Sequence, residues 1–204
     1  MAHSDSFAMA TRPNFGPGFT SWADLEIQNP VQGTRGNKTA AIEIRGAAPV
    51  LWRLPSLVPA FEPSSFGGEA DAVRQTATFR VPDAQLELFE GLEEWVVSYC
   101  VAASDRLFGK TMTEDAVRAM FNSPLKRHDR YGGNLRCKLI LAGQNKTRFW
   151  TTENLPRGPP EVWRQCEMKT VVKIVGLWWV GREFGVMLQL ADCQVAETLV
   201  ASPF

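Results

Sequence analysis

Basic and aromatic residues alternate through the C-terminal part of this 204-residue chain. The segment PLKRHDRYGGNLRCK carries five cations and a tyrosine, and QNKTRFW places two cations beside a phenylalanine and a tryptophan. Further on, LWWVGREFG holds adjacent tryptophans, an arginine and a phenylalanine. Lys and Arg neutralise phosphates, and aromatic rings stack on bases for about 1–3 kcal/mol per base. The pattern therefore indicates a surface for single-stranded nucleic acid.

The tryptophan pair poses a question of orientation. In a regular strand Trp178 and Trp179 point to opposite faces. Trp178 shares its face with Val172 and Ile174, which is the core side, so we predict that Trp179 is the stacking residue. A β-bulge at Gly176 would reverse this assignment, and burial of both rings would leave the pair as core alone.

The predicted interface joins cationic and aromatic side chains from this part of the chain. They are Lys126, Arg127, Arg130, Tyr131, Arg136, Lys138, Lys146, Arg148, Trp150, Lys169, Lys173, Trp179, Arg182 and Phe184.

Motifs for catalysis or metal binding are missing from the sequence. It has no phosphate-binding loop, dinucleotide fingerprint, nucleophile elbow or HExxH motif. Two histidines are too few for an ordinary zinc site, and the adjacent His128 and Asp129 are read as loop residues. Glutamates 87, 90, 93 and 94 are read as the solvated faces of a helix. We predict no enzymatic activity and no cofactor.

Charge is distributed unevenly although the net charge is zero. Residues 82–122 sum to about −5 and residues 123–204 to about +5, so the basic half is the expected site of an anionic partner. No apolar run approaches the roughly 18 residues of a membrane span. The chain opens without a secretory signal, and its four cysteines form no CxxC pair. Free thiols are therefore expected, in a reducing intracellular compartment such as the nucleus or a cytoplasmic replication site.

Hydrophobic patterns predict the elements that must hold these side chains. Strands are expected at 38–46, at 48–55 as its hairpin partner, and at 74–82, with a loop at 56–68. A long helix is expected at 82–109, ending at Gly109, and a short one at 113–121 with Thr113 as N-cap. Four strands follow, at 135–143, 147–153, 169–180 and 182–197, with loops at 128–134 and 154–163. Helices segregated among antiparallel strands predict an α+β fold, most simply a small β-barrel with a helical insertion.

Domain organisation follows from the same reading. Residues 1–19 are predicted to be a flexible arm and residues 20–204 a single domain, with the helical insertion at about 82–122.

The closing segment VVKIVGLWWVGREFGVMLQLADCQVAE resembles the C-terminal hairpin of OB-fold single-stranded DNA-binding proteins from large DNA viruses and phages. The opening WxxL at Trp22–Leu25 and the strand LRCKLIL are similar to elements of the same family. The resemblance implies an OB-like barrel that holds single-stranded DNA without strong sequence preference. By position, a binding role would fall to Arg136, Lys138, Trp178, Trp179, Arg182 and Phe184.

These observations favour a non-enzymatic protein that binds single-stranded nucleic acid in DNA replication, recombination or repair. Whether RNA is also bound and whether the protein forms homo-oligomers are left open. The alternatives are a structural or interaction protein, such as a viral assembly component with the tryptophan hairpin at a protein interface, and an enzyme whose site the sequence does not reveal.

Overall fold

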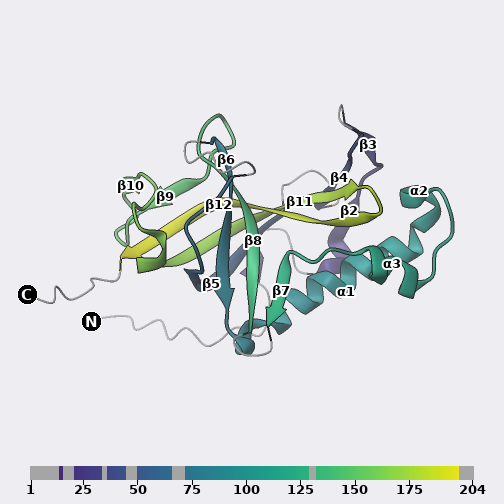
Figure 1. Ribbon diagram of the computed structural model, residues 1–204, viewed down its shortest axis with the longest axis horizontal. Helices are drawn as coiled ribbons and strands as arrows, with labels where there is room; N and C mark the ends of the chain where they lie inside the picture. The colour runs from purple at the N-terminus through teal and green to yellow at the C-terminus, as the bar shows by residue number, and fades with distance from the viewer. Residues whose placement is uncertain are drawn as a thin grey trace, which may run out of the picture.

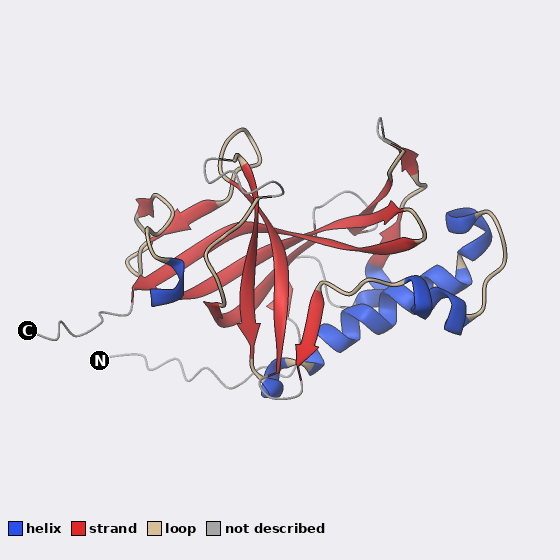
Figure 2. Cartoon of the chain, viewed as in Figure 1, coloured by secondary structure: helices blue, strands red, loops and turns tan. Residues whose placement is uncertain are grey.

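The computed structural model describes residues 14–15, 21–33, 36–44, 50–65, 72–128 and 132–197. In these ranges a large mixed sheet dominates, and the α-helices gather together at one side of it (Figures 1 and 2). The predicted α+β class is confirmed. Most of the predicted N-terminal arm lies outside the described residues, and its residues 14–15 pair with a strand of the sheet.

The first half of the chain contributes the strands β1 (Asn14–Phe15), β2 (Leu25–Ile27), β3 (Val31–Gln32), β4 (Lys38–Ile44), β5 (Val50–Pro59) and β6 (Arg74–Val81). The helices follow as α1 (Glu87–Ala102), α2 (Ser104–Phe108) and α3 (Glu114–Met120). The second half contributes β7 (Leu125–His128), β8 (Gly132–Ile140), β9 (Arg148–Trp150), β10 (Pro156–Arg157), β11 (Cys166–Val180) and β12 (Glu183–Glu197). Short 3-10 helices lie at Trp22–Asp24, Asp83–Gln85 and Trp163–Gln165.

Five of these strands form a closed circuit of pairings. β12 pairs with β8, β8 with β6, β6 with β5, β5 with β11, and β11 returns to β12. Every pairing in the circuit is antiparallel except β12 with β8, which are parallel where Gln189 faces Lys138. Outside the circuit, β4 pairs with β11 and β2 pairs with β4. Likewise β9 pairs with β12 and β10 pairs with β9.

The predicted hairpin between 38–46 and 48–55 is wrong. β11 lies between these two strands and pairs with both of them. Its residues 168–174 face β5, and its residues 176–179 face β4. A strand of 15 residues is long enough to serve two partners in succession, which a reading of local sequence does not reveal.

Further elements also differ from prediction. β8 begins at Gly132 and β10 covers Pro156–Arg157, both inside predicted loops. β5 continues into the loop predicted at 56–68 and ends at Pro59. Its register shifts between Arg53 and Ser56, and Pro55 lies within this irregularity, where a residue without an N–H is tolerated. β7 covers residues 125–128, which were not expected to form a strand, and pairs with β8.

The α-helices follow β6 and cover part of the core. The predicted long helix is divided into α1 and α2, and it ends at Gly109 with φ of 75°, as the sequence indicates. Thr113 caps α3 by accepting a hydrogen bond from Ala116 N–H. α1 buries Phe89 and Leu92, and the Phe89 ring lies 5.1 Å from that of Trp52 on β5.

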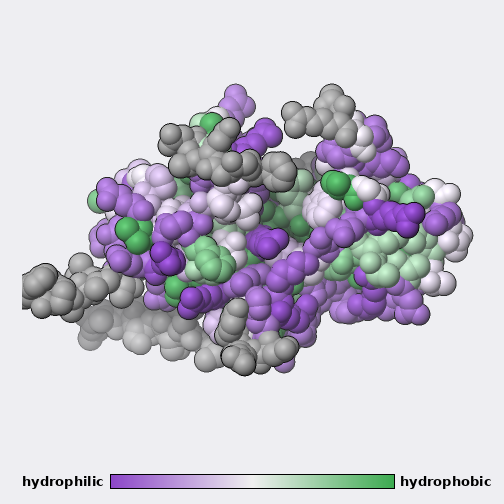
Figure 3. All heavy atoms as spheres, viewed as in Figure 1, coloured by the Kyte–Doolittle hydropathy of each residue, from purple (hydrophilic) through white to green (hydrophobic). Residues whose placement is uncertain are grey.

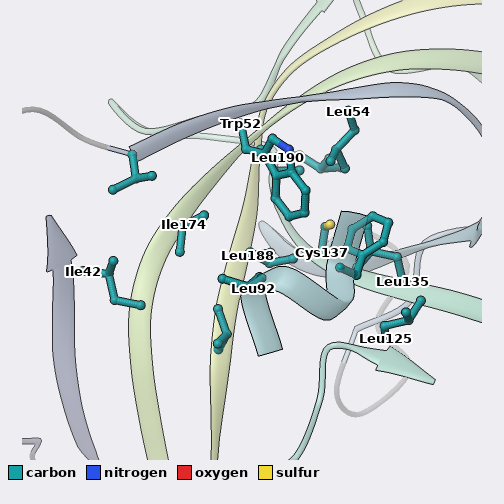
Figure 4. Close-up of a cluster of buried hydrophobic side chains, with 14 of the residues drawn as sticks. Ile42, Trp52, Leu54, Leu92, Leu125, Leu135, Cys137, Ile174, Leu188 and Leu190 are labelled. Carbon is teal, nitrogen blue, oxygen red and sulfur yellow. The ribbon is translucent and has the colours of Figure 1, made fainter. Parts of the chain in front are cut away.

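The core lies inside the strand circuit and against α1. Figure 4 shows Trp52, Leu92, Leu188 and Leu190 converging from β5, α1 and β12. The four cysteines are free and buried, as expected of thiols that never pair. Burial raises the pKa of the Cys100 thiol to about 12. In the described residues no helix has the length and apolarity of a membrane span.

Candidate nucleic-acid interface

A β-bulge in β11 decides which tryptophan faces the core. Ile174 faces Leu188 and Gly176 faces Met187, so Val175 is an extra residue opposite a single step of β12. The buried positions on β11 change there from even to odd numbers. The bulge lies where Gly176 is needed, because a Cβ at that position would come within 2.1 Å of the Ala40 carbonyl oxygen on β4.

The prediction that Trp179 offers a ring for stacking is therefore corrected. Trp179 is 8% exposed and packs against Phe108 and Phe184, and Phe184 itself is fully buried. Both residues belong to the core. Trp178 is half-buried and points to the outer face, so the two rings separate as expected but in the reverse order.

Trp178 lines a groove on the outer face of the strand circuit. The groove has a volume of about 370 Å³. Its walls come from β6, β8, the start of β12, the tip of β11 and the segment 122–124 that follows α3. The lining residues are Thr76, Asn122, Ser123, Pro124, Arg136, Cys137, Lys138, Trp178, Val186, Met187 and Leu188. Among them there is no Asp or Glu.

The two cations of the groove alternate on β8. Cys137 between them is buried, so Arg136 and Lys138 both point outward. Thr76 on β6 and Gln189 on β12 face Lys138 from its two sides. Burial, with a smaller effect of the nearby Arg74 charge, lowers the pKa of the Lys138 amine. In the described part of the chain neither Arg136 nor Lys138 has a carboxylate partner.

Two carboxylates contact the segment 122–124 of the groove wall. Glu93 on α1 accepts hydrogen bonds from Ser123 and, at 2.8 Å, from Arg127. Glu183 accepts one from the Asn122 amide at 2.9 Å. Arg127 neutralises Glu93, whereas the neutral Asn122 amide holds the Glu183 carboxylate in place. Figure 3 shows a band of hydrophilic residues crossing the middle of this face, in the region of β7 and β8.

A second group of predicted residues lies together at the far end of β12. Arg148 and Trp150 on β9 both bind Asp192, Arg148 Nη2 to Oδ2 at 2.7 Å and Trp150 Nε1 to Oδ1 at 2.8 Å. The Arg148 guanidinium lies 5.8 Å from the centre of the Trp150 ring. Lys146 is exposed in the loop just before them.

The remaining predicted cations among the described residues do not line the groove. Lys126 donates to Asn122 Oδ1 at 2.7 Å, and Arg127 is neutralised by Glu93. Lys173 faces Gln189 across the hairpin, and Lys169 lies further along β11 opposite Gln194. Arg182 is exposed in the turn of the hairpin. The remaining two, Arg130 and Tyr131, lie outside the described residues.

Sequence reasoning missed the polar residues of the groove. Thr76, Asn122 and Ser123 are not basic or aromatic and come from segments distant in the chain. Gln189 gave a local signal, because it is the one polar residue in the strand VMLQL. A polar residue between buried leucines marks the outer face of β12.

Comparison with known proteins finds solved structures alone. No protein-family model matches the sequence, and no curated protein matches it. The chain is similar to the single-stranded DNA-binding protein from bacteriophage Enc34 in complex with ssDNA, with TM-score 0.45 and 10% identity over 84% of this chain and 92% of that one. It is also similar to gp2.5, a single-stranded DNA binding protein encoded by bacteriophage T7, with TM-score 0.49 and 11% identity over 77% and 91%.

Proposed function

We propose that this protein binds single-stranded nucleic acid in the groove lined by Arg136, Lys138 and Trp178, with single-stranded DNA as its preferred ligand. We also propose that it is not an enzyme. One observation carries the proposal. Two cations without carboxylate partners and a half-exposed indole share a groove that no acidic residue lines. A partly desolvated amine such as Lys138 is costly until an anion compensates it. A phosphate backbone supplies that anion, and a base supplies the flat partner for Trp178.

The order of strands supports an OB-like barrel. Numbered along the chain, the circuit β5, β6, β8, β11, β12 pairs as 1-2-3-5-4 and back to 1, with the third and fifth strands parallel. In OB-folds the face of strands 2 and 3 binds oligonucleotides, and these strands correspond to β6 and β8, which line the groove. We propose one domain, residues 20–204, with residues 82–122 as its helical insertion.

Binding is expected to be largely independent of sequence. The Asn122 amide, which has the chemistry to read a base edge, is engaged on both sides, by Lys126 and by Glu183. Stacking and phosphate contacts remain, and neither distinguishes one base from another strongly. A sequence-tolerant binder of single strands suits DNA replication, recombination or repair, and the free buried thiols suit a reducing compartment. A protein interface at the hairpin is less well supported, because Trp179 lies in the core.

The test is a fluorescence-anisotropy titration of labelled oligo-dT with wild-type protein and variants. We expect Trp178→Ala to lose about 1–3 kcal/mol of affinity and the double variant Arg136→Gln/Lys138→Gln to bind weakly and with a smaller salt dependence. Lys110→Gln is the control, since it removes an exposed charge outside the groove. Oligo-U and duplex DNA, measured in parallel, establish the preferred nucleic acid. Absence of binding, or an affinity unchanged by Trp178→Ala, would contradict the proposal.

A further inference from the structure

We infer that the nucleic-acid binding site extends along β12 to a second base-stacking subsite at Trp150. Asp192 lowers the affinity of this subsite because it neutralises Arg148. The inference rests on the proposed function and adds to it a site, a ligand and a control element. The ligand is a second base with its phosphate, on the same strand that occupies the first groove.

A hollow of about 320 Å³ is formed by β9, β10 and the segments that flank them, and β9 pairs with the far end of β12. Lys146, Arg148, Trp150 and Arg157 line it together with the apolar Phe149. It therefore combines the same two chemistries as the first groove, cations and an accessible indole. Arg157 is paired with Glu197 at 2.6 Å and Arg148 with Asp192 at 2.7 Å, so among the described residues Lys146 is the cation of the hollow without a carboxylate partner.

Asp192 arranges this hollow and neutralises it. Its two oxygens bind the Trp150 indole N–H and the Arg148 guanidinium, and its own side chain is 20% exposed. The first contact fixes the ring in place for stacking. The second cancels the charge of Arg148, whose side chain is 61% exposed and free to exchange Asp192 for a phosphate.

The two sites lie on the same outer face of β12. Gln189 faces Lys138 in the first groove, and its side chain donates to the Asn145 carbonyl at 3.0 Å, beside Lys146 of the second site. Beyond Gln189 a bulge at Ala191 shifts the alternation, so that Asp192 remains on this face although its number is even. A strand leaving the first groove thus meets Gln189 and then Lys146.

The spacing predicts a dependence on oligonucleotide length. Trp178 faces Gly185 and Trp150 faces Gln194, which are nine residues apart, or about 30 Å at the rise of a β-strand. An oligonucleotide of about four residues occupies one site, whereas one of about 16 residues, the upper range for an OB-fold, spans both.

The decisive experiment compares labelled oligo-dT of about 4 and about 16 nucleotides on the full chain. Trp150→Ala should weaken binding of the long oligonucleotide about 5- to 150-fold and leave the short one within about twofold. Trp178→Ala should weaken both. Equal loss for both lengths with Trp150→Ala, or no loss for either, would overturn the second subsite. If Trp178→Ala has no effect, or neither oligonucleotide binds, the proposed function fails instead.

A second variant distinguishes the subsite from a folding defect. Asp192→Asn keeps an oxygen for the Trp150 N–H and removes the charge that neutralises Arg148. Affinity for the long oligonucleotide should rise about two- to fivefold at low salt, and the slope of log affinity against log salt should steepen by about 0.7. A damaged fold would lower affinity. An unchanged or lower affinity with an unchanged melting temperature would refute the role of Asp192.

Discussion

Trp178 lies over Gly185, the residue that faces it across the β11–β12 hairpin. A Cβ at position 185 would come within 2.8 Å of the indole and 2.5 Å of the Asn122 carbonyl oxygen. The absence of a side chain on β12 therefore lets a large ring on β11 lie close to the sheet while it lines the groove. The placement of Trp178 depends on Gly185 as much as on the bulge at Val175.

Gly185→Ala should accordingly cost stability and affinity together. Overpacking at this point destabilises by about 1–3 kcal/mol, and displacement of the indole weakens oligo-dT binding. Urea unfolding and anisotropy titration measure the two effects. Gly158→Ala is the control for stability, because a Cβ there meets no atom within 4 Å. Equal stability of the two variants would show that the contact at position 185 relaxes without cost.

Trp179→Ala should act on folding, since the ring packs on Phe108 and Phe184 inside the core. The expected loss of unfolding free energy is about 3–5 kcal/mol, measured by urea denaturation. Trp178→Ala serves as the matched control and should remain folded. A reversed order of stability would mean that Val175 is not bulged in solution.

Salt should weaken binding strongly. If the groove and the neighbouring lysines engage about four phosphates, log affinity should fall with log salt at a slope near −3. Titrations of oligo-dT from low to moderate ionic strength measure this slope. An affinity that does not change with salt would exclude the cationic groove as the binding site.

The Lys138 amine should make binding sensitive to alkaline pH. Its pKa in the free protein is lowered by burial and by Arg74, so it loses its proton at lower pH than an exposed lysine does. A bound phosphate favours the charged form, which raises the pKa in the complex. Affinity should therefore fall as pH rises between these two values, beginning below the range of an ordinary lysine. Lys138→Arg, which stays charged, should flatten the profile, and a profile equal to that of the wild type would assign the effect elsewhere.

The acidic helix should contribute little to binding. Glu94 is paired with Arg118, which lowers the pKa of its carboxyl, and Glu87 is exposed on α1. Glu87→Gln/Glu94→Gln is therefore expected to leave oligo-dT affinity within about twofold at ordinary salt. A tenfold gain, about 1.4 kcal/mol, would instead place α1 beside the nucleic acid.

Local sequence patterns correctly predicted the features that depend on residues close together in the chain. The alternation at Ile42 and Ile44, the N-cap at Thr113 and the stop at Gly109 all correspond to observed features. The cationic residues Arg136 and Lys138 were found because alternation on one strand is enough to place them on one face.

The predictions that were wrong concern features that depend on contacts between distant segments of the chain. The insertion of β11 between β4 and β5 is fixed by pairing across more than a hundred residues. The bulge at Val175 follows from the close approach of Gly176 to Ala40, which no window around the tryptophans contains. The groove wall at 122–124 is positioned by Asn122 N–H bonding the Phe184 carbonyl at 2.7 Å.

The double partnership of β11 also bears on how the chain folds during synthesis. β4 and β5 emerge early and find their shared neighbour only when residues 166–180 follow, and the circuit closes only after β12. Pairings this remote in sequence are slow to form. β4 and β5 therefore each keep one edge unpaired until β11 has been made. β11 and β12 thus close the circuit of pairings and also supply residues that line the groove.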